Sequence, residues 1–256
     1  MIFIQKQLQK FIDIPFKEQV FSGAQNPRLW ANRMRIGHDD LEQFSLKLED
    51  IPDSGMDRHM ARAICRDPAR HVLIGYICAM AWGGQGVGAS VGSAKKSWAA
   101  RAALVPVLKE LRCGTLTRAQ AYDLFCGDGE ISGLGPSFFT KLIFFFSRDP
   151  DCYIMDQWTA KSINYLTGET VVLMSRHWPS RKNCGENFSR YCELVDELVV
   201  LLSLRDQINT GEQVEQRLFS NGGREKIRGE WRAVVTKAFI RKEKLPVAPL
   251  DSPTAD

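Results

Sequence analysis

The stretch that decides the fold runs from Ile131 to Asn164 and reads ISGLGPSFFTKLIFFFSRDPDCYIMDQWTAKSIN. It opens with Gly133-Leu134-Gly135, a turn that suits glycine because glycine reaches positive φ without a steric penalty. Pro136 follows, and proline is favoured at the first position of a helix. The pattern predicts a tight turn that leads directly into a helix.

The predicted helix is almost wholly apolar from Phe138 to Phe146, which indicates burial on nearly all sides. Its polar residues fall three, four and seven positions apart and are therefore expected on one face: Ser137, Thr140, Lys141 and Arg148. The helix should end before Pro150, because the residue preceding a proline avoids the helical conformation.

A second helix is predicted after an apolar run. Cys152 to Met155 leads into Asp156, and Gln157 to Asn164 has a helical pattern. Asp156 stands where an N-cap belongs, and a capping role alone is the default interpretation of this residue. Upstream, Thr117 to Phe125 predicts a further helix that pairs with the one beginning at Pro136.

Together these features resemble the helix-hairpin-helix (HhH-GPD) DNA glycosylase superfamily, and within it the 8-oxoguanine glycosylases and the OGG-fold proteins of bacterial antiphage gene clusters. The likeness extends from Thr117 to Leu166, and Asp156 follows Ser137 by nineteen positions, the family's separation between lysine and aspartate. The resemblance implies an all-α fold of two helical lobes, with the hairpin at the cleft between them.

The domain organisation expected from this likeness is a single catalytic unit over residues 1–245. One lobe would contain the hairpin, about residues 68–155, and the other would combine 1–67 with 156–245. Residues 246–256 have the composition of a disordered tail.

The resemblance implies excision of a damaged base, with Asp156 stabilising positive charge on the sugar and activating water. The antiphage relatives imply a narrower target, a modified base of phage DNA. Ser137 occupies the family's Schiff-base lysine position and has no amine, so we favour hydrolysis without lyase activity. The alternative is a glycosylase/AP lyase that uses Lys141 as nucleophile. A phosphate-contacting or cleft-lining Lys141 is the preferred interpretation.

Binding roles are assigned from the glycine turn and from the chemistry of nearby residues. The DNA backbone is expected to contact the turn and a basic, aromatic segment around Pro179, and the residues concerned are Gly133, Leu134, Gly135, Ser137, Arg176 and Lys182. The base pocket is expected to contain Phe138, Trp158 and Trp82. The alternative interpretation of each aromatic residue is a role in the hydrophobic core. The alternative for the segment around Pro179 is a solvated loop.

Two further function classes stay open. A non-catalytic helix-hairpin-helix module would bind DNA without releasing a base. A nucleotide-binding protein would use the glycine-rich Gly83 to Lys96, although this segment fails the phosphate-loop template because Ser93 and Ala94 precede Lys95.

Composition sets the remaining expectations. The net charge of +4 permits DNA binding without demanding it, and seven scattered cysteines without a C-x-x-C pair suit free thiols in a reducing cytoplasm. No metal-ligand spacing occurs among the histidines and cysteines, and no apolar run approaches a membrane span. We therefore expect a cytoplasmic monomer that binds double-stranded DNA, with no cofactor, nucleotide, metal or membrane.

Overall fold

The structure is a computed structural model that describes residues 2–15, 26–83, 90–149, 151–206, 208–219 and 230–243. Within these ranges the chain is helical apart from one two-stranded hairpin, so the all-α prediction is confirmed. The elements are α1 (Gln5–Asp13), α2 (Pro27–Met34), α3 (His38–Glu42), η1 (Leu48–Asp50), α4 (Arg58–Arg66), α5 (Val72–Trp82), α6 (Ser90–Ala99), α7 (Arg101–Cys113), α8 (Arg118–Asp123), η2 (Gly127–Gly129), α9 (Pro136–Phe146), α10 (Gln157–Thr167), β1 (Met174–Ser175), β2 (Trp178–Pro179), α11 (Gly185–Asp206), α12 (Gly211–Phe219) and α13 (Glu230–Glu243).

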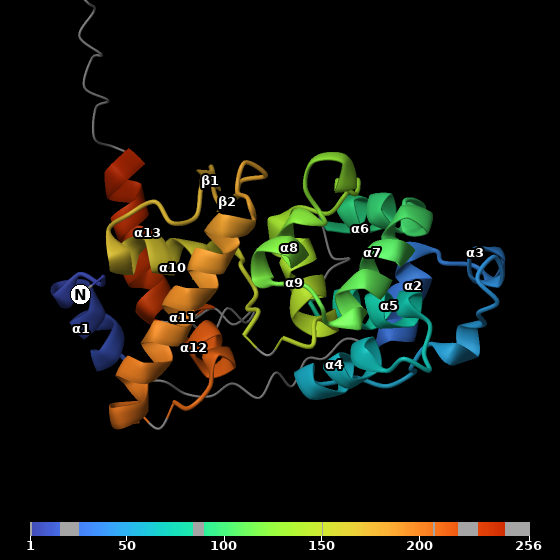
Figure 1. The fold of residues 1–256 in the computed structure, drawn as a ribbon, viewed down its shortest axis with the longest axis horizontal. Helices are drawn as coiled ribbons and strands as arrows, with labels where there is room; N and C mark the ends of the chain where they lie inside the picture. The colour runs from blue at the N-terminus through green and yellow to red at the C-terminus, as the bar shows by residue number, and fades with distance from the viewer. Residues whose placement is uncertain are drawn as a thin grey trace, which may run out of the picture.

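The helices form two lobes that lie side by side, α2 to α9 in one and α1 with α10 to α13 in the other (Figure 1). Helices α2 and α4 pack on α5, and α4 also packs on α9. Residues 27–66 therefore lie with the hairpin lobe, in contrast to the predicted division at residue 67. Gly75 explains the close crossing of α4 and α5, since a Cβ there would lie 3.0 Å from the Cα of Cys65.

Helix α9 is the core of the hairpin lobe. Its residues from Leu142 to Phe146 are fully or almost fully buried. On another side, the ring of Phe139 stacks on Phe125, with centroids 4.9 Å apart. The helix begins at Pro136 behind Gly135, as the sequence predicts, and its C-cap is Ser147.

The two lobes meet where α8 packs on α11. Tyr122 of α8 stacks on Phe188 of α11, with ring centroids 5.2 Å apart. Asp123 accepts a hydrogen bond from the Gly185 backbone at 2.7 Å, and Arg118 pairs with Asp196 at the same distance. This contact fixes the hairpin lobe against the lobe that contains α10.

Two regions differ from what their sequence indicates. A proline inside a helical stretch predicts a kink or a break, but Pro106 lies within α7 and the break from α6 falls at Ala100. Residues 1–26 have no clear helical period, yet α1 forms among them and buries Phe11. Arg217 donates hydrogen bonds to three carbonyl groups at the end of α1, of Phe11, Ile12 and Ile14, and so stabilises a helix with weak local signals.

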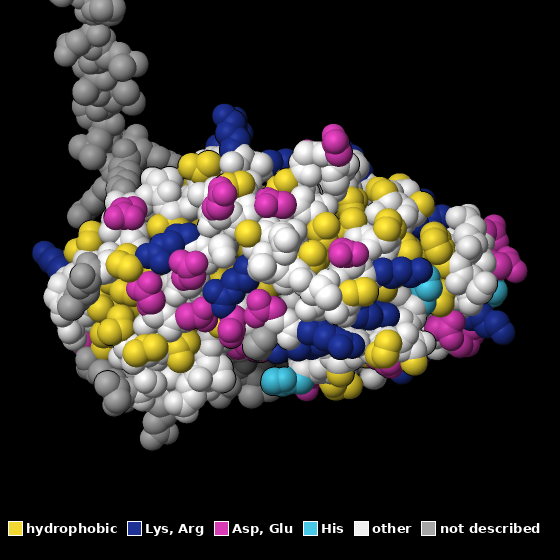
Figure 2. All heavy atoms as spheres, in the orientation of Figure 1, with side chains coloured by type: hydrophobic (Ala, Val, Ile, Leu, Met, Phe, Trp, Pro, Cys, Tyr) yellow, Lys and Arg dark blue, Asp and Glu magenta, His cyan; other side chains and the backbone are white. Residues whose placement is uncertain are grey.

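Two segments named in the sequence analysis lie outside the described residues: the tail 246–256, and residues 84–89 of the glycine-rich segment. In the described part of the chain, no helix has the length and apolarity needed to cross a membrane. The face drawn in Figure 2 carries both signs of charge, with basic side chains gathered over the hairpin lobe.

Candidate active site

Asp156 lies at the start of α10, on the boundary between the lobes, and is its N-cap as predicted. One carboxylate oxygen, Oδ1, accepts hydrogen bonds from the backbone N–H groups of Trp158 and Thr159, at 2.7 and 2.9 Å. No described residue donates to the other oxygen, Oδ2. The cap fixes the side chain and leaves one oxygen for a ligand.

Hydrogen bonds from three helices fix the segment that precedes Asp156. Met155 donates its N–H to the hydroxyl of Thr140 at 3.2 Å, and that hydroxyl donates to the Pro136 carbonyl at 2.7 Å. The carbonyl of Ile154 accepts from Tyr191 at 2.8 Å and from Thr159 at 3.0 Å. The carboxylate is therefore placed by α9, α10 and α11 together.

Burial and charge act in opposite directions on this group. Burial raises the pKa of the Asp156 carboxyl above its usual value, while the two backbone hydrogen bonds, Lys141 and Arg232 each lower it. Such a group has a less solvated negative charge than a surface aspartate. That property suits a carboxylate that stabilises positive charge in a site from which water is excluded.

Asp156 lines a pocket of about 390 Å³, together with residues from both lobes. Its walls are formed by Arg58, Trp82, Gly83, Lys141, Ile154, Gln157, Trp158, Trp178, Glu215, Gln216, Phe219 and Arg232. This volume falls in the range of small-molecule sites, which start near 300 Å³. The predicted catalytic pair, Asp156 and Lys141, lies in this one pocket.

Lys141 enters the pocket from α9. Burial lowers the pKa of its amine, whereas the charges of Asp156 and Glu215 raise it. Gly83 leaves room for the amine, since a Cβ on Gly83 would lie 3.0 Å from Nζ. Ser137 is not among the lining residues, and Arg148, expected on the same face as Lys141, lies beyond the end of α9 in another hollow.

A buried ion pair crosses the pocket between the lobes. Arg58 of α4 pairs with Glu215 of α12, and the two residues are only 7% and 5% exposed. The Arg58 guanidinium also lies over the ring of Phe144, 3.9 Å from its centroid. Glu215 accepts the N–H of Ile154 at 3.4 Å, so the pair also supports the segment before Asp156. Burial raises the pKa of Glu215, and Arg58 lowers it.

The three predicted base-pocket residues have different positions. Trp82 and Trp158 line the pocket. The guanidinium of Arg232 lies over the Trp158 ring, 4.3 Å from its centroid. Phe138 is not among the lining residues, but the centroid of its ring lies 5.9 Å from Nζ of Lys141.

The two glycines of the hairpin turn serve different purposes. Gly133 has φ +84, and a Cβ there would lie 2.3 Å from the Ser93 carbonyl oxygen of α6. Gly135 has an ordinary φ of −91 and open space around its missing Cβ. Leu134, between them, is buried, so only its backbone is available to DNA. Gly133 is thus required for packing, and Gly135 leaves the backbone accessible.

Substitution of the two glycines should separate these roles. Gly133→Ala should lower the free energy of unfolding by about 2–4 kcal/mol, because it combines left-handed strain with a clash against α6. Gly135→Ala should change it by less than about 1 kcal/mol, the loss of a glycine N-cap, yet weaken duplex binding by adding a methyl where a phosphate would approach. Urea unfolding and fluorescence anisotropy measure the two quantities. Equal unfolding energies for both variants would contradict this division.

Arg176 and Lys182, the other predicted DNA contacts, lie in the segment of the β1–β2 hairpin and are exposed. Arg176 adopts φ +55, which is uncommon for a residue other than glycine. Arg181, between them, donates to the Leu134 carbonyl at 2.6 Å. The predicted basic segment and the predicted hairpin turn are therefore in direct contact.

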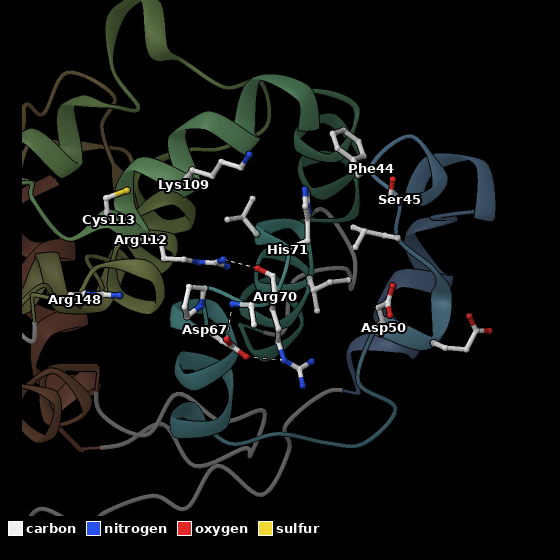
Figure 3. A pocket seen from close by; sticks show the side chains of 16 residues that line it. Phe44, Ser45, Asp50, Asp67, Arg70, His71, Lys109, Arg112, Cys113 and Arg148 are labelled. Atoms are coloured by element: carbon white, nitrogen blue, oxygen red, sulfur yellow. Dashed lines mark hydrogen bonds and ion pairs between the residues drawn. The ribbon is translucent and has the colours of Figure 1, made fainter.

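A larger hollow of about 1180 Å³ lies in the hairpin lobe and shares no lining residue with the pocket at Asp156 (Figure 3). Arg112 occupies one wall, where Nε donates to the Cys65 carbonyl at 2.8 Å and Nη1 to that of Arg70 at 2.6 Å. Arg70 pairs with Asp67 at 3.4 Å. These bonds hold the connection between α4 and α5, and we assign the hollow no catalytic role.

Sequence reasoning did not identify several pocket residues: Arg58, Glu215, Gln216, Phe219 and Arg232. One signal was available in α12, where Glu215 neighbours the buried Val214 and lies three residues before the buried Leu218. A carboxylate among buried positions of a helix requires a partner, and here that partner is Arg58.

Comparison with known proteins gives one match. The model of a protein family described as "Putative 8-oxoguanine DNA glycosylase OGG-like protein" matches residues 24–219. No curated protein and no solved structure matches the chain. The matched residues include α9, Asp156, and both Arg58 and Glu215.

Proposed function

The chain belongs to this OGG-like family, and from that premise we propose that it is a DNA glycosylase. It binds duplex DNA across the hairpin turn, everts one nucleotide into the pocket between the lobes, and hydrolyses the bond between base and sugar. The observation that carries the proposal is Asp156, which has one oxygen engaged by the α10 N-terminus and the other directed at no described donor.

In this mechanism the chain supplies charge and position. As the base departs, positive charge develops on the sugar, and the Asp156 carboxylate stabilises it. Oδ2 also accepts a proton from the attacking water. Lys141 and Arg232 favour the ionised carboxyl, since the charge of each lowers a pKa that burial raises. We assign contact with the planar base to Trp82, Trp158 and Phe219, the aromatic residues that line the pocket beside Trp178.

Base release from defined duplexes tests the proposal. Each duplex carries one modified base, with 8-oxoguanine first and modified pyrimidines and purines of the kind found in phage DNA next. Incubation with the protein and then with alkali should cleave the strand at the modified base. Absence of abasic sites from every duplex, with tight binding to all of them, would favour a non-catalytic DNA-binding module.

A second activity, AP lyase, is favoured by the position of Lys141. Its amine lies in the same pocket as Asp156, and burial lowers its pKa. The unprotonated amine would attack C1′ as the base leaves with a proton, giving a Schiff base with the opened sugar. Loss of a C2′ proton then expels the 3′ phosphate. The serine at position 137 does not prevent this route.

Trapping with borohydride distinguishes the two activities. If Lys141 is the nucleophile, borohydride should give a covalent protein–DNA adduct that Lys141→Ala abolishes and Lys109→Ala retains, because Lys109 is exposed and lines the other hollow, to which we assign no catalytic role. Denaturing gel electrophoresis measures the adduct. Base release by the wild type without any adduct would leave hydrolysis alone.

A further inference from the structure

The β1–β2 hairpin places one tryptophan at the mouth of the pocket. Trp178 lines the pocket, yet 56% of the residue is exposed. Its cross-strand partner is Ser175, and the two-residue turn between them consists of Arg176 and His177, both exposed. Because this exposed indole lies beside a pocket, a ligand that enters the pocket and covers the indole would remove apolar surface from water.

Trp178 differs from the other two tryptophans of the pocket. The ring of Trp82 meets the ring of Phe145 edge-on, with centroids 5.1 Å apart, and Arg58 lies 5.5 Å from its centroid. Trp158 lies under the guanidinium of Arg232. No aromatic ring or cation in the described ranges stacks on Trp178. Its faces are therefore available to a nucleic-acid base.

The hairpin is fixed relative to the proposed phosphate-binding turn. Arg181 follows β2 closely and bonds to the Leu134 carbonyl at 2.6 Å and to Glu130 at 2.7 Å. Asn183 closes the base of the hairpin, since its side chain accepts from the Leu173 N–H at 2.8 Å and donates to the Leu173 carbonyl at 2.9 Å. DNA held at residues 133–135 would thus meet Trp178 at a set distance.

The turn itself is shaped to present this side chain. Arg176 adopts φ +55, a conformation that costs free energy for a residue with a Cβ. Pro179, directly after Trp178, is buried, and β2 contacts both α9 and α10. The hairpin is therefore anchored on the helix of the turn and on the helix of Asp156, while Trp178 projects outward.

We propose that Trp178 inserts into the duplex and stacks on the base that loses its neighbour when the target nucleotide enters the pocket. This inference rests on the proposed glycosylase function and assigns the residue that keeps the nucleotide everted. An aromatic side chain that unstacks a base step and fills the gap is a general device of DNA-distorting proteins. Trp178 lines the pocket mouth and more than half of it is exposed, so part of the side chain faces the region where the duplex would lie.

A duplex with a built-in gap tests the assignment independently of the excised base. One duplex carries a tetrahydrofuran residue, a stable abasic analogue, beside 2-aminopurine, and a second duplex is intact. The wild type should bind the gapped duplex more tightly, and Trp178→Ala should weaken that binding about tenfold, the usual effect of removing one stacked aromatic residue. Trp178→Phe should restore most of it. Leu173→Ala is the matched control, because Leu173 is exposed on the same hairpin but does not line the pocket.

The fluorescence of 2-aminopurine should change on binding of the wild type and the Phe variant, and not on binding of Trp178→Ala. If Trp178→Ala binds the gapped duplex as tightly as the wild type does, Trp178 does not stack in the gap and the proposal is overturned. Slower base excision by that variant would then indicate that Trp178 contacts the everted base instead. If the wild type binds neither duplex, the proposed glycosylase function fails as well. Failure of the Trp178 proposal alone would instead leave binding by the wild type intact.

Discussion

Asp156→Asn should reduce base excision by about 10²- to 10³-fold while duplex binding stays within about twofold, since losing one stabilising charge in a preorganised site has effects of that size. Asparagine has nearly the shape of aspartate and accepts the same backbone hydrogen bonds, so α10 keeps its cap. Single-turnover excision and anisotropy measure the two quantities.

The same variant should be at least as stable as the wild type at neutral pH. Burial raises the pKa of Asp156 in the folded protein, so its contribution to stability is greatest at acidic pH and is lost as the pH rises through the raised pKa. Asparagine carries no charge, and the advantage of the variant should therefore vanish below the ordinary aspartate pKa. Asp156→Ala should instead lose about 1 kcal/mol, because it removes the cap.

The raised pKa also sets the acidic limit of activity. Because the mechanism requires the carboxylate, excision should fall as the pH drops through the raised pKa, at higher pH than for an ordinary aspartate. Full excision by Asp156→Asn would remove this residue from the chemistry. The pocket and the family membership would stand, but another group would have to stabilise the sugar.

Arg58→Met should lower the free energy of unfolding by about 3–5 kcal/mol, the usual effect of leaving a buried charge without its partner. Glu215 would then be buried without its counter-charge, whereas Glu212, the other partner of Arg58, would keep its ion pair with Arg62. Excision should also fall, because Glu215 holds the N–H of Ile154 just before Asp156. Urea unfolding at pH 7 measures the stability effect.

The double variant Arg58→Met/Glu215→Leu should recover most of the lost stability. Replacing both partners by apolar side chains removes the uncompensated charge, and burial already raises the pKa of Glu215 despite Arg58. Arg190→Met is the control, as the ion pairs of Arg190 are about 40% exposed and should contribute less than about 1 kcal/mol. Additive losses in the double variant would contradict the interpretation of Arg58 and Glu215 as one unit.

The centre of the fold was predictable because its signals are local. Gly133 and Pro136 mark the start of α9, its apolar run marks burial, and Asp156 marks the start of α10 by its chemistry as an N-cap. Lys141 was predictable as a cleft residue because it lies one helical turn after Ser137. Each inference used fewer than ten neighbouring residues.

The other half of the pocket depends on distant pairing. Arg58 and Glu215 are 157 residues apart, and neither residue indicates the other in the sequence. The placement of residues 27–66 depends likewise on the close crossing at Gly75, which composition does not reveal. The strands of the hairpin have two residues each, too few for a period, and its turn uses Arg176 where glycine would have been a signal.

The hydroxyl of Thr140 links the first turn of α9 to Met155, next to the carboxylate. The proposed phosphate-binding turn and the proposed catalytic carboxylate are thus both positioned by one continuous helix, in which each residue is rotated by about 100° from the one before it. Adding a residue within its first turn would swing Lys141 away from Asp156. A residue added between Ser147 and Asp151 would leave the spacing within α9 unchanged. Homologous chains should therefore vary in length on the far side of α9 and keep an unchanged count from Gly133 to Lys141.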